Sequence, residues 1–329
     1  MRMTQIMNDH ARLRDAVRDR KDRDQLSLTQ IASACGVSGP VISSFLGGNY
    51  AGDNEKVAGK LQLWLEAQET KERNRSERPV VPGFIMTETA RTIMNLIETA
   101  QYDVDLAVIS GNAGTGKTMA AEEYQKRTNN VFLITADPSL SSPSAVLLEI
   151  AETLGCNDKG QRRIRSIIRR LKGTEAVLII DEAQHLSVKA VEEIRSIHDQ
   201  AKVGVVFMGN APLNAKFDGL GRTADYAQLF SRIGLRRKIN KPRQKDMCAI
   251  LAGWDGVQGE EVQLYAKEIG RREGGLRSMS KVLRNATKIA RVNKRDQITR
   301  KDLECAWSEH MTGEFPKIRM KGGSGDVQS

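Results

Sequence analysis

The stretch SGNAGTGKTMAAEEY, residues Ser110 to Tyr124, contains the pattern that decides the fold of this chain. Its central part fits GxxxxGK[ST], in which glycines let backbone N–H groups approach phosphate oxygens without obstruction by side chains. The apolar stretch VDLAVIS (104–110) before it predicts a strand, and TMAAEEYQKR after it predicts a helix whose positive N-terminus faces the phosphates. The pattern therefore predicts a nucleotide site formed by Gly111, Asn112, Ala113, Gly114, Thr115, Gly116, Lys117 and Thr118.

Two acidic residues follow a second apolar strand, in the stretch AVLIIDEAQ (176–184). We expect Asp181 to hold Mg²⁺ together with the hydroxyl of Thr118, while Lys117 reaches the β- and γ-phosphates. Glu182 would polarise the attacking water. A pair of solvated acids at a strand end is the alternative, but the position downstream of a phosphate loop favours a nucleotide-hydrolysing site.

Three further polar residues are candidates for the same site. Asn210 follows the apolar stretch VGVVFM (203–208), where it would orient the water or contact the γ-phosphate, or simply form a turn. Arg232 in LFSRIG and Arg277 in GGLRSM are candidates for stabilising the charge that develops during phosphoryl transfer, which is worth about 10³–10⁵ in rate. An ordinary surface arginine is at least as common an explanation for each of the two.

The alternation of strands and helices predicts an α/β fold. Short apolar strands at 104–110, 131–135, 176–180 and 203–208 with helical stretches between them predict a parallel sheet covered by helices on both faces. From about Arg243 to Glu309 no further strand is evident, and four stretches have apolar residues at helical spacing. Thr299, with Asp302 three positions later, is the expected N-cap of the last helix. The expected divisions are a helical domain (1–68), a linker (69–83), an α/β core (84–240), a basic helical lid (241–312) and a flexible tail (313–329).

Composition limits the classes of function. The 329 residues carry a net charge of +10, with a pI near 9.5, which favours a polyanionic partner. No apolar run is long enough for a membrane span, and the charged N-terminus lacks the apolar stretch of a signal peptide, so we expect a cytoplasmic protein without a membrane partner. The cysteines are scattered without CxxC spacing, which favours reduced thiols over zinc or disulfides.

The segment LTQIASACGVSGPVISSFL (28–46) has the spacing of a helix-turn-helix. Gly36 falls at the turn, where a positive φ is needed, and Ser38 is the expected N-cap of a second helix that tolerates Pro40 in its first turn. A domain that contacts another protein is the alternative. If the segment binds DNA, the side chains expected to face it are Gln30, Ser43 and Ser44.

Two basic segments are the strongest candidates for contact with the DNA backbone. QRRIRSIIRRLKG (161–173) has an apolar face and contains no acid, and Arg162 and Arg163 are its first candidates. NKPRQK (240–245) adds Lys241, Arg243 and Lys245. Contacts to phosphates fix position without reading bases, so we expect duplex DNA to be bound without strong sequence preference.

The motifs GNAGTGKT, IIDEA, MGN, FSRI and GGLR occur in the order typical of the AAA+ ATPases, which the chain resembles from Phe84 to about Glu309. The resemblance implies ATP and Mg²⁺ as cofactors and a homo-oligomer, because an arginine of one subunit completes the site of its neighbour. It also implies roles for three residues: Asn210 as the first sensor, Arg232 as that arginine finger, and Arg277 as the second sensor.

Nearly the whole chain, including the N-terminal segment SLTQIASACGVSGPVISSFLGGNYAGDNEKV, resembles the target-DNA activators of Mu-like transposing phages. This resemblance implies an ATP-dependent protein that polymerises on duplex DNA, delivers the DNA to a transposase and stimulates strand transfer. Hydrolysis would release the protein from DNA. Two other functions stay open: a helicase loader, which shares the AAA+ core, and a nucleotide-sensing transcription regulator that binds one operator.

Overall fold

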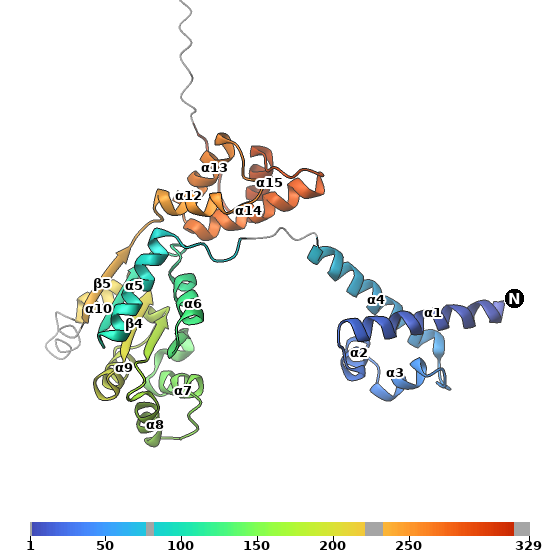
Figure 1. Cartoon of the computed structure of the whole chain (residues 1–329), viewed down its shortest axis with the longest axis horizontal. Coiled ribbons are helices and arrows are strands. Elements are labelled where there is room, and N and C mark those ends of the chain that lie inside the picture. The colour runs from blue at the N-terminus through green and yellow to red at the C-terminus, as the bar shows by residue number, and fades with distance from the viewer. Residues whose placement is uncertain (1, 77–81, 221–232, 319–329) are drawn as a thin grey trace, which may run out of the picture. The chain divides into compact units, whose positions relative to one another are not determined.

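The computed structural model describes residues 2–76, 82–220 and 233–318. The contacts of the chain divide it into two units, Met1–Arg78 and Pro79–Ser329, and both are drawn in Figure 1. Within the described ranges, no helix combines the length and the hydrophobicity needed to span a bilayer.

The N-terminal unit is helical. Its elements are α1 (Arg2–Arg23), α2 (Leu28–Cys35), α3 (Gly39–Leu46) and α4 (Asn54–Ser76). Gly36 ends α2 with φ +61°, Ser38 precedes α3, and the core contains the buried Ile31, Ile42 and Phe45. These local features agree with the expected helices, while DNA binding by this unit stays a prediction.

The predicted boundary at residue 68 is wrong for the helix that crosses it. Helix α4 continues to Ser76 because the segment EAQETKERNRS consists mainly of residues with high helix propensity. A tertiary contact also holds its last turns, because the buried Arg20 pairs with Glu72 at 2.8 Å and with Asp24 at 2.6 Å. The first part of the expected linker is therefore helical.

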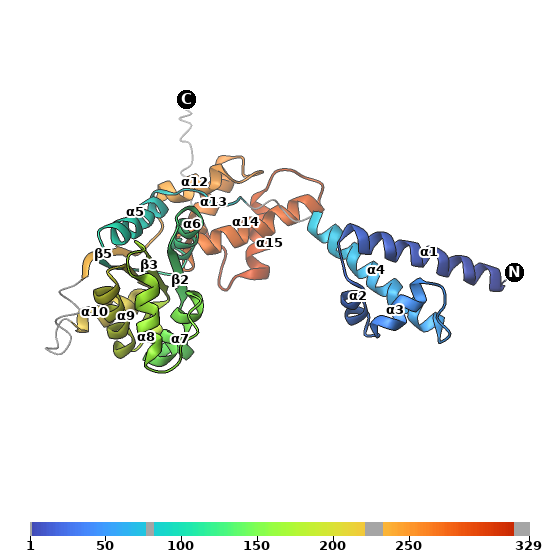
Figure 2. The same ribbon diagram turned by 60° about the horizontal axis from the view of Figure 1, so that its bottom comes forward.

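The second unit contains a parallel sheet of five strands in the order β2-β3-β4-β1-β5. The strands are β1 (Leu106–Gly111), β2 (Val131–Thr135), β3 (Val177–Asp181), β4 (Gly204–Gly209) and β5 (Ile233–Ile239). The helices are α5 (Glu88–Tyr102), α6 (Lys117–Arg127), α7 (Pro143–Thr153), α8 (Arg162–Leu171), α9 (Val188–Ala201) and α10 (Ala211–Leu220). The predicted parallel sheet covered by helices is confirmed (Figure 2).

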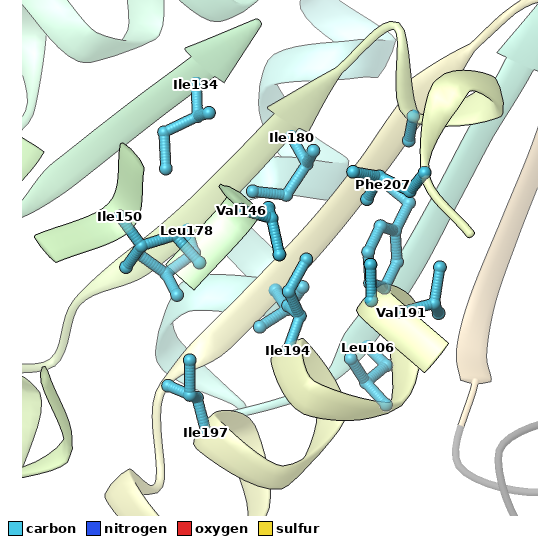
Figure 3. Packing of buried hydrophobic residues seen from close by; sticks show 14 of the residues in the cluster. Leu106, Ile134, Val146, Ile150, Leu178, Ile180, Val191, Ile194, Ile197 and Phe207 are labelled. Atoms are coloured by element: carbon cyan, nitrogen blue, oxygen red, sulfur yellow. The ribbon is translucent and has the colours of Figure 1, made fainter. Parts of the chain in front are cut away.

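Side chains alternate between the two faces of the sheet and build a core on each. One core lies under α7 and α9, where Ile180 and Phe207 from the strands meet Val191 and Ile194 of α9 (Figure 3). The other core lies under α5 and α6 and contains Ile93, Ile97 and Ile109 with their neighbours. Because both faces are covered, the inner strands read as continuous apolar runs.

Strand β5 was not among the expected strands. It lies at the edge of the sheet and pairs only with β1 among the described strands, and its Arg236, Arg237 and Lys238 are exposed. An edge strand can carry charges on its open side, so it lacks the apolar run that identifies an inner strand in the sequence.

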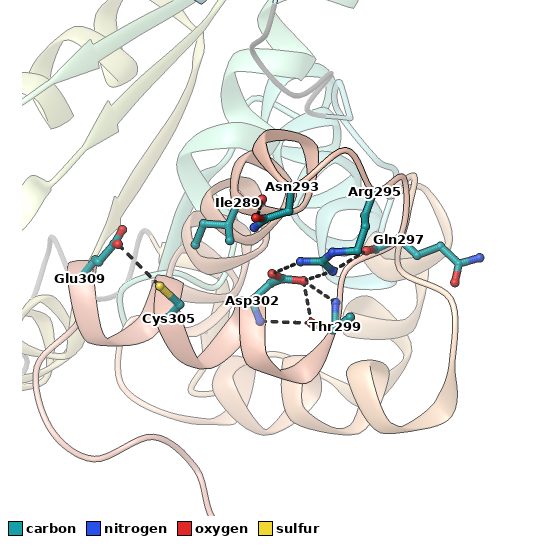
Figure 4. Close-up of polar contacts among 8 residues, drawn as sticks. All are labelled: Ile289, Asn293, Arg295, Gln297, Thr299, Asp302, Cys305 and Glu309. Atoms are coloured by element: carbon teal, nitrogen blue, oxygen red, sulfur yellow. Dashed lines mark hydrogen bonds and ion pairs between the residues drawn. The ribbon is translucent and has the colours of Figure 1, made fainter.

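Four helices form the lid, as expected: α12 (Gln244–Ala252), α13 (Glu260–Arg271), α14 (Gly275–Val292) and α15 (Arg300–His310). The predicted cap of the last helix is confirmed, because Thr299 and Asp302 form a capping box (Figure 4). Burial alone would raise the pKa of Asp302, but hydrogen bonds from Arg295 and Thr299 outweigh it and hold the pKa below its usual value.

The predicted tail does not begin at residue 313. Phe315 stacks on Tyr265 with ring centroids 5.2 Å apart, and it packs with Ile318 against the lid core. Burial of these two apolar side chains stabilises the segment 313–318 on the lid, although the flanking residues are polar. The remainder of the expected tail lies outside the described residues.

A buried carboxylate joins the lid to the core. Asp246 at the start of α12 is fully buried and accepts hydrogen bonds from the backbone N–H and the hydroxyl of Thr89, at 3.1 and 2.5 Å, in the first turn of α5. The same carboxylate accepts the N–H of Arg243 at 3.3 Å and so caps its own helix. Removing it would leave buried donors of two helices unpaired.

Replacing Asp246 by alanine is expected to lower the free energy of unfolding by about 3 kcal/mol, because hydrogen bonds to a charged group are lost and buried donors stay unsatisfied. Urea unfolding followed by circular dichroism measures the change. Asp255→Ala, which removes an exposed carboxylate of the same lid, is the control and should change little. Equal effects of the two substitutions would contradict the structural role of Asp246.

Candidate active site

The phosphate loop connects β1 to α6 at the carboxyl edge of the sheet. Lys117, the first residue of α6, is only 7% exposed, and its Nζ donates hydrogen bonds to the carbonyls of Gly111 and Asn112, both at 2.9 Å. Burial lowers the pKa of Lys117, while the nearby carboxylates of Asp181 and Glu182 oppose that shift. The ammonium is therefore buried within the loop that it would help to hold around phosphates.

Thr118, in the first turn of α6, meets Asp181 at the end of β3. The hydroxyl of Thr118 donates to Oδ2 of Asp181 at 2.6 Å, and this carboxylate is 2% exposed. A hydroxyl and a carboxylate side by side are oxygen ligands of the kind that Mg²⁺ takes, with substrate phosphates and water completing its coordination. The donor set thus fits the predicted magnesium site.

Glu182 and Asn210 come together although they lie at the ends of different strands. Glu182 adopts the left-handed conformation with φ +52°, and its Oε2 lies 3.5 Å from Nδ2 of Asn210. Gln184, which the sequence analysis did not select, donates to the same Oε2 at 2.5 Å. Strands β3 and β4 are neighbours, so their polar end residues are brought to one place.

The lid contacts the phosphate loop directly. The backbone N–H of Leu276 in α14 donates to the carbonyl of Gly114 at 2.8 Å, and Gly274 lies against the same glycine. Arg277 follows Leu276 and faces the pocket that the loop forms with the lid. The predicted second sensor therefore lies beside the predicted phosphate site.

A pocket of about 480 Å³ lies between the phosphate loop and the lid. Its lining includes the apolar side chains of Phe84, Ile85, Ile250 and Trp254. An apolar lining suits the flat, weakly polar base of a nucleotide. Residues that sequence reasoning missed also line the pocket, namely Lys281 and Arg284. They lie one and two helical turns after Arg277 on α14, and this spacing could have identified them in the sequence.

The candidates for DNA contact are in different surroundings. Arg162 is exposed, whereas the guanidinium of Arg163 lies 3.4 Å from the carbonyl of Ser144. Arg243 pairs with Glu88 at 2.8 Å and Lys245 lies 3.9 Å from the same carboxylate, but the two basic side chains are 45% and 85% exposed. Lys241 is exposed.

The N-terminal candidates Gln30, Ser43 and Ser44 are exposed, and the Gln30 side chain accepts the N–H of Ser27 at 2.8 Å as part of a capping box. That local bond explains a glutamine at this position without DNA. Arg232, the predicted arginine finger, lies outside the described residues.

The five-stranded sheet, the phosphate loop with Asp181 and Glu182, and the helical lid define an AAA+ ATPase. The AAA domain family matches residues 101–217, and a family described as Mu B transposition protein, C terminal, matches residues 231–310. Among solved structures, the Aeropyrum pernix ORC1 protein in complex with DNA is similar in fold, with a TM-score of 0.51, 19% identity, and coverage of 68% of this chain and 66% of that chain.

The relatives are closer in sequence. The chain is 38% identical over 281 residues to the ATP-dependent target DNA activator B of Escherichia phage Mu, which covers 84% of this chain and 88% of the relative. It is 37% identical to the Mu-like prophage FluMu DNA transposition protein B of Haemophilus influenzae, over 80% of this chain and 93% of the relative. The chain belongs to the family of Mu target DNA activator B proteins, and it is an ATPase.

Proposed function

We propose that the chain binds duplex DNA in an ATP-dependent manner, oligomerises on it without strong sequence preference, and delivers it to a transposase, stimulating strand transfer. Hydrolysis of ATP would release the protein from DNA in the cytoplasm of a host bacterium. The observation that carries this proposal is the pocket shared by phosphate loop and lid, in a chain whose relatives are named ATP-dependent target DNA activators.

The proposed roles in hydrolysis follow from the contacts. Lys117 and the loop N–H groups would bind phosphates, and Thr118 with Asp181 would hold Mg²⁺. When bound, Mg²⁺ would neutralise the negative charge that develops on the phosphate oxygens. Glu182 would accept a hydrogen bond from the attacking water, and Asn210 beside it would help to orient that water. Arg277 would stabilise charge on the transferred phosphoryl group.

Coupling between ATP and DNA requires that ATP bind one state of the protein better than another. The lid is a candidate source of this difference, because its backbone bonds to the phosphate loop at Gly114. Arg232, supplied to a neighbouring subunit, is proposed as the second source. If Arg232→Ala retained normal assembly and normal hydrolysis with ATP, the role of a finger would have to be abandoned.

The best-supported candidate for contact with the DNA backbone is Arg162. It is exposed at the start of α8, and it lines a polar surface depression of about 590 Å³ together with Lys159 and Arg165. Arg163 is proposed as its neighbour in the same interface. Lys241 stays a candidate, and so do Arg243 and Lys245, because their exposed ion pairs with Glu88 are weak and leave both charges accessible to phosphates.

The test is binding to random-sequence duplex DNA with ATP, with ADP or without nucleotide, over a range of salt, with electron microscopy of the same mixtures. Filaments that require ATP and an affinity that falls steeply with salt would support the proposal. Tight binding to one site that ignores ATP would favour the transcription regulator. Stimulation of helicase loading, in place of strand transfer by a transposase, would favour the helicase loader.

In the same measurement, Arg162→Ala is expected to reduce the slope of log K against log[salt] by about one, because one phosphate contact is lost, and to weaken binding similarly for all sequences. Arg91→Ala, which removes an exposed arginine of α5, is the control and should leave the slope unchanged. An unchanged slope for Arg162→Ala would remove Arg162 from the interface.

A further inference from the structure

A single side chain, that of Gln184, connects the ends of strands β3 and β4 beside the phosphate site. Its Nε2 donates to Oε2 of Glu182 at 2.5 Å, and its Oε1 accepts the backbone N–H of Asn210 at 3.2 Å. Glu182 follows the last residue of β3, and Asn210 follows the last residue of β4. The amide of Gln184 thus spans the gap between the proposed base and the proposed first sensor.

The surroundings of Gln184 are built to hold it. A Cβ atom at Gly209 would lie 2.3 Å from its Oε1, so the absence of a side chain at residue 209 leaves the room that this amide occupies. On the backbone, Nζ of Lys216 in α10 donates to the carbonyl of Gln184 at 2.6 Å and to that of Leu186. Burial lowers the pKa of Lys216, so the charge is partly desolvated in order to hold these two carbonyls.

The direction of the bonds to Glu182 decides what the glutamine can do. The amides of Gln184 and Asn210 both donate to the same carboxylate oxygen, Oε2, and the bond from Gln184 is the shorter one, 2.5 Å against 3.5 Å. Neither amide donates a hydrogen bond to the other oxygen, Oε1, in the part of the chain that the structure describes. A carboxylate held in this way can offer Oε1 to a water molecule in a fixed orientation.

We propose that Gln184 is a positioning residue for ATP hydrolysis, which fixes the Glu182 carboxylate through Oε2 so that Oε1 accepts a hydrogen bond from the attacking water. The inference rests on the proposed role of Glu182. Small displacements of a reacting group can cost about a hundredfold in rate, so a residue that touches neither ATP nor water can still control the turnover number.

The test is steady-state hydrolysis by Gln184→Met, which keeps the size of the side chain but removes the donor and the acceptor. We expect kcat to fall about ten- to a hundredfold, the cost of a lost hydrogen bond to a charged group, while KM for ATP and the melting temperature stay close to those of the unaltered protein. Gln184→Glu should be at least as slow, because its carboxylate cannot donate and repels Glu182. Gly209→Ala, which displaces the amide sterically, should also lower kcat.

Gln200→Ala is the matched control, since it removes an exposed glutamine whose Nε2 donates to Ser196 on α9, and it should hydrolyse ATP normally. An unchanged or raised kcat of Gln184→Met would overturn the inference. So would a fall in kcat matched by a higher KM and a lower melting temperature, because that pattern indicates a structural role.

Glu182→Gln, measured in parallel, separates the two hypotheses. If Glu182→Gln is inactive while Gln184→Met is normal, only the inference on Gln184 fails. If Glu182→Gln hydrolyses ATP at the normal rate, the proposed role of Glu182 fails, and the inference fails with it.

Discussion

Replacing Glu182 by glutamine is expected to lower the rate of ATP hydrolysis about 10²- to 10⁴-fold, the range that a general base contributes. The substitution keeps the size of the side chain, and the phosphate-binding loop, Thr118 and Asp181 stay intact, so ATP should still bind. Release of inorganic phosphate measures the rate, and equilibrium titration with a fluorescent ATP analogue measures the affinity.

The consequence for DNA follows from the proposed coupling. If ATP binding favours the DNA-bound assembly and hydrolysis ends it, Glu182→Gln should form complexes with DNA in ATP that persist after dilution, whereas the unaltered protein dissociates. Dissociation that stays as fast as in the unaltered protein would break the link between hydrolysis and release.

Glu175→Gln provides a matched control for this experiment. Glu175, like Glu182, is a glutamate in the left-handed conformation, with φ +50° against +52°, but it is exposed before β3 and does not line the nucleotide pocket. The control should hydrolyse ATP normally. A loss of activity in both variants would indicate that the effect is not specific to the carboxylate of Glu182.

Replacing Gly114 by alanine is expected to reduce ATP affinity and hydrolysis by at least about a hundredfold, because the loop in its present conformation leaves no room for a side chain at this residue. The added Cβ would lie 1.8 Å from the carbonyl oxygen of Gly274 in the lid, a backbone atom that cannot rotate away as a flexible side chain could. The loop and the lid must therefore separate, and the hydrogen bond from Leu276 to Gly114 would break. Arg277, which follows Leu276, would move away from the phosphate site with it.

Gly173→Ala separates this steric effect from backbone strain. Gly173 has φ +77°, almost the value of +76° at Gly114, but a Cβ there would meet no atom within 4 Å. Both substitutions strain the backbone by about 1–3 kcal/mol, so both should lower thermal stability. Only Gly114→Ala should weaken ATP binding in an equilibrium titration, and equal affinities of the two variants would contradict the proposed coupling of lid and loop.

The sequence alone determined four of the five strands of the sheet and the centre of the site. The phosphate loop, Asp181 and Glu182 could be predicted because their signals are local: an apolar strand, a glycine-rich turn and a helix follow one another within a few residues. The capping box of Thr299 and Asp302 is of the same kind, since both partners lie in one turn of helix. Such local patterns can be recognised in the amino-acid sequence without the fold.

The tertiary structure decided which distant residues meet. Strand β5 forms because it can pair with the edge of β1, although the sequence of β5 is charged. In the sequence, Arg243 and Lys245 belong to a basic segment, and only the fold shows that α5 brings Glu88 beside them. Gln184 acquires its role only where β3 and β4 lie side by side, and Gly114 only where the lid meets the loop. Such contacts depend on long-range packing and leave no period or spacing in the sequence, so only the folded chain shows them.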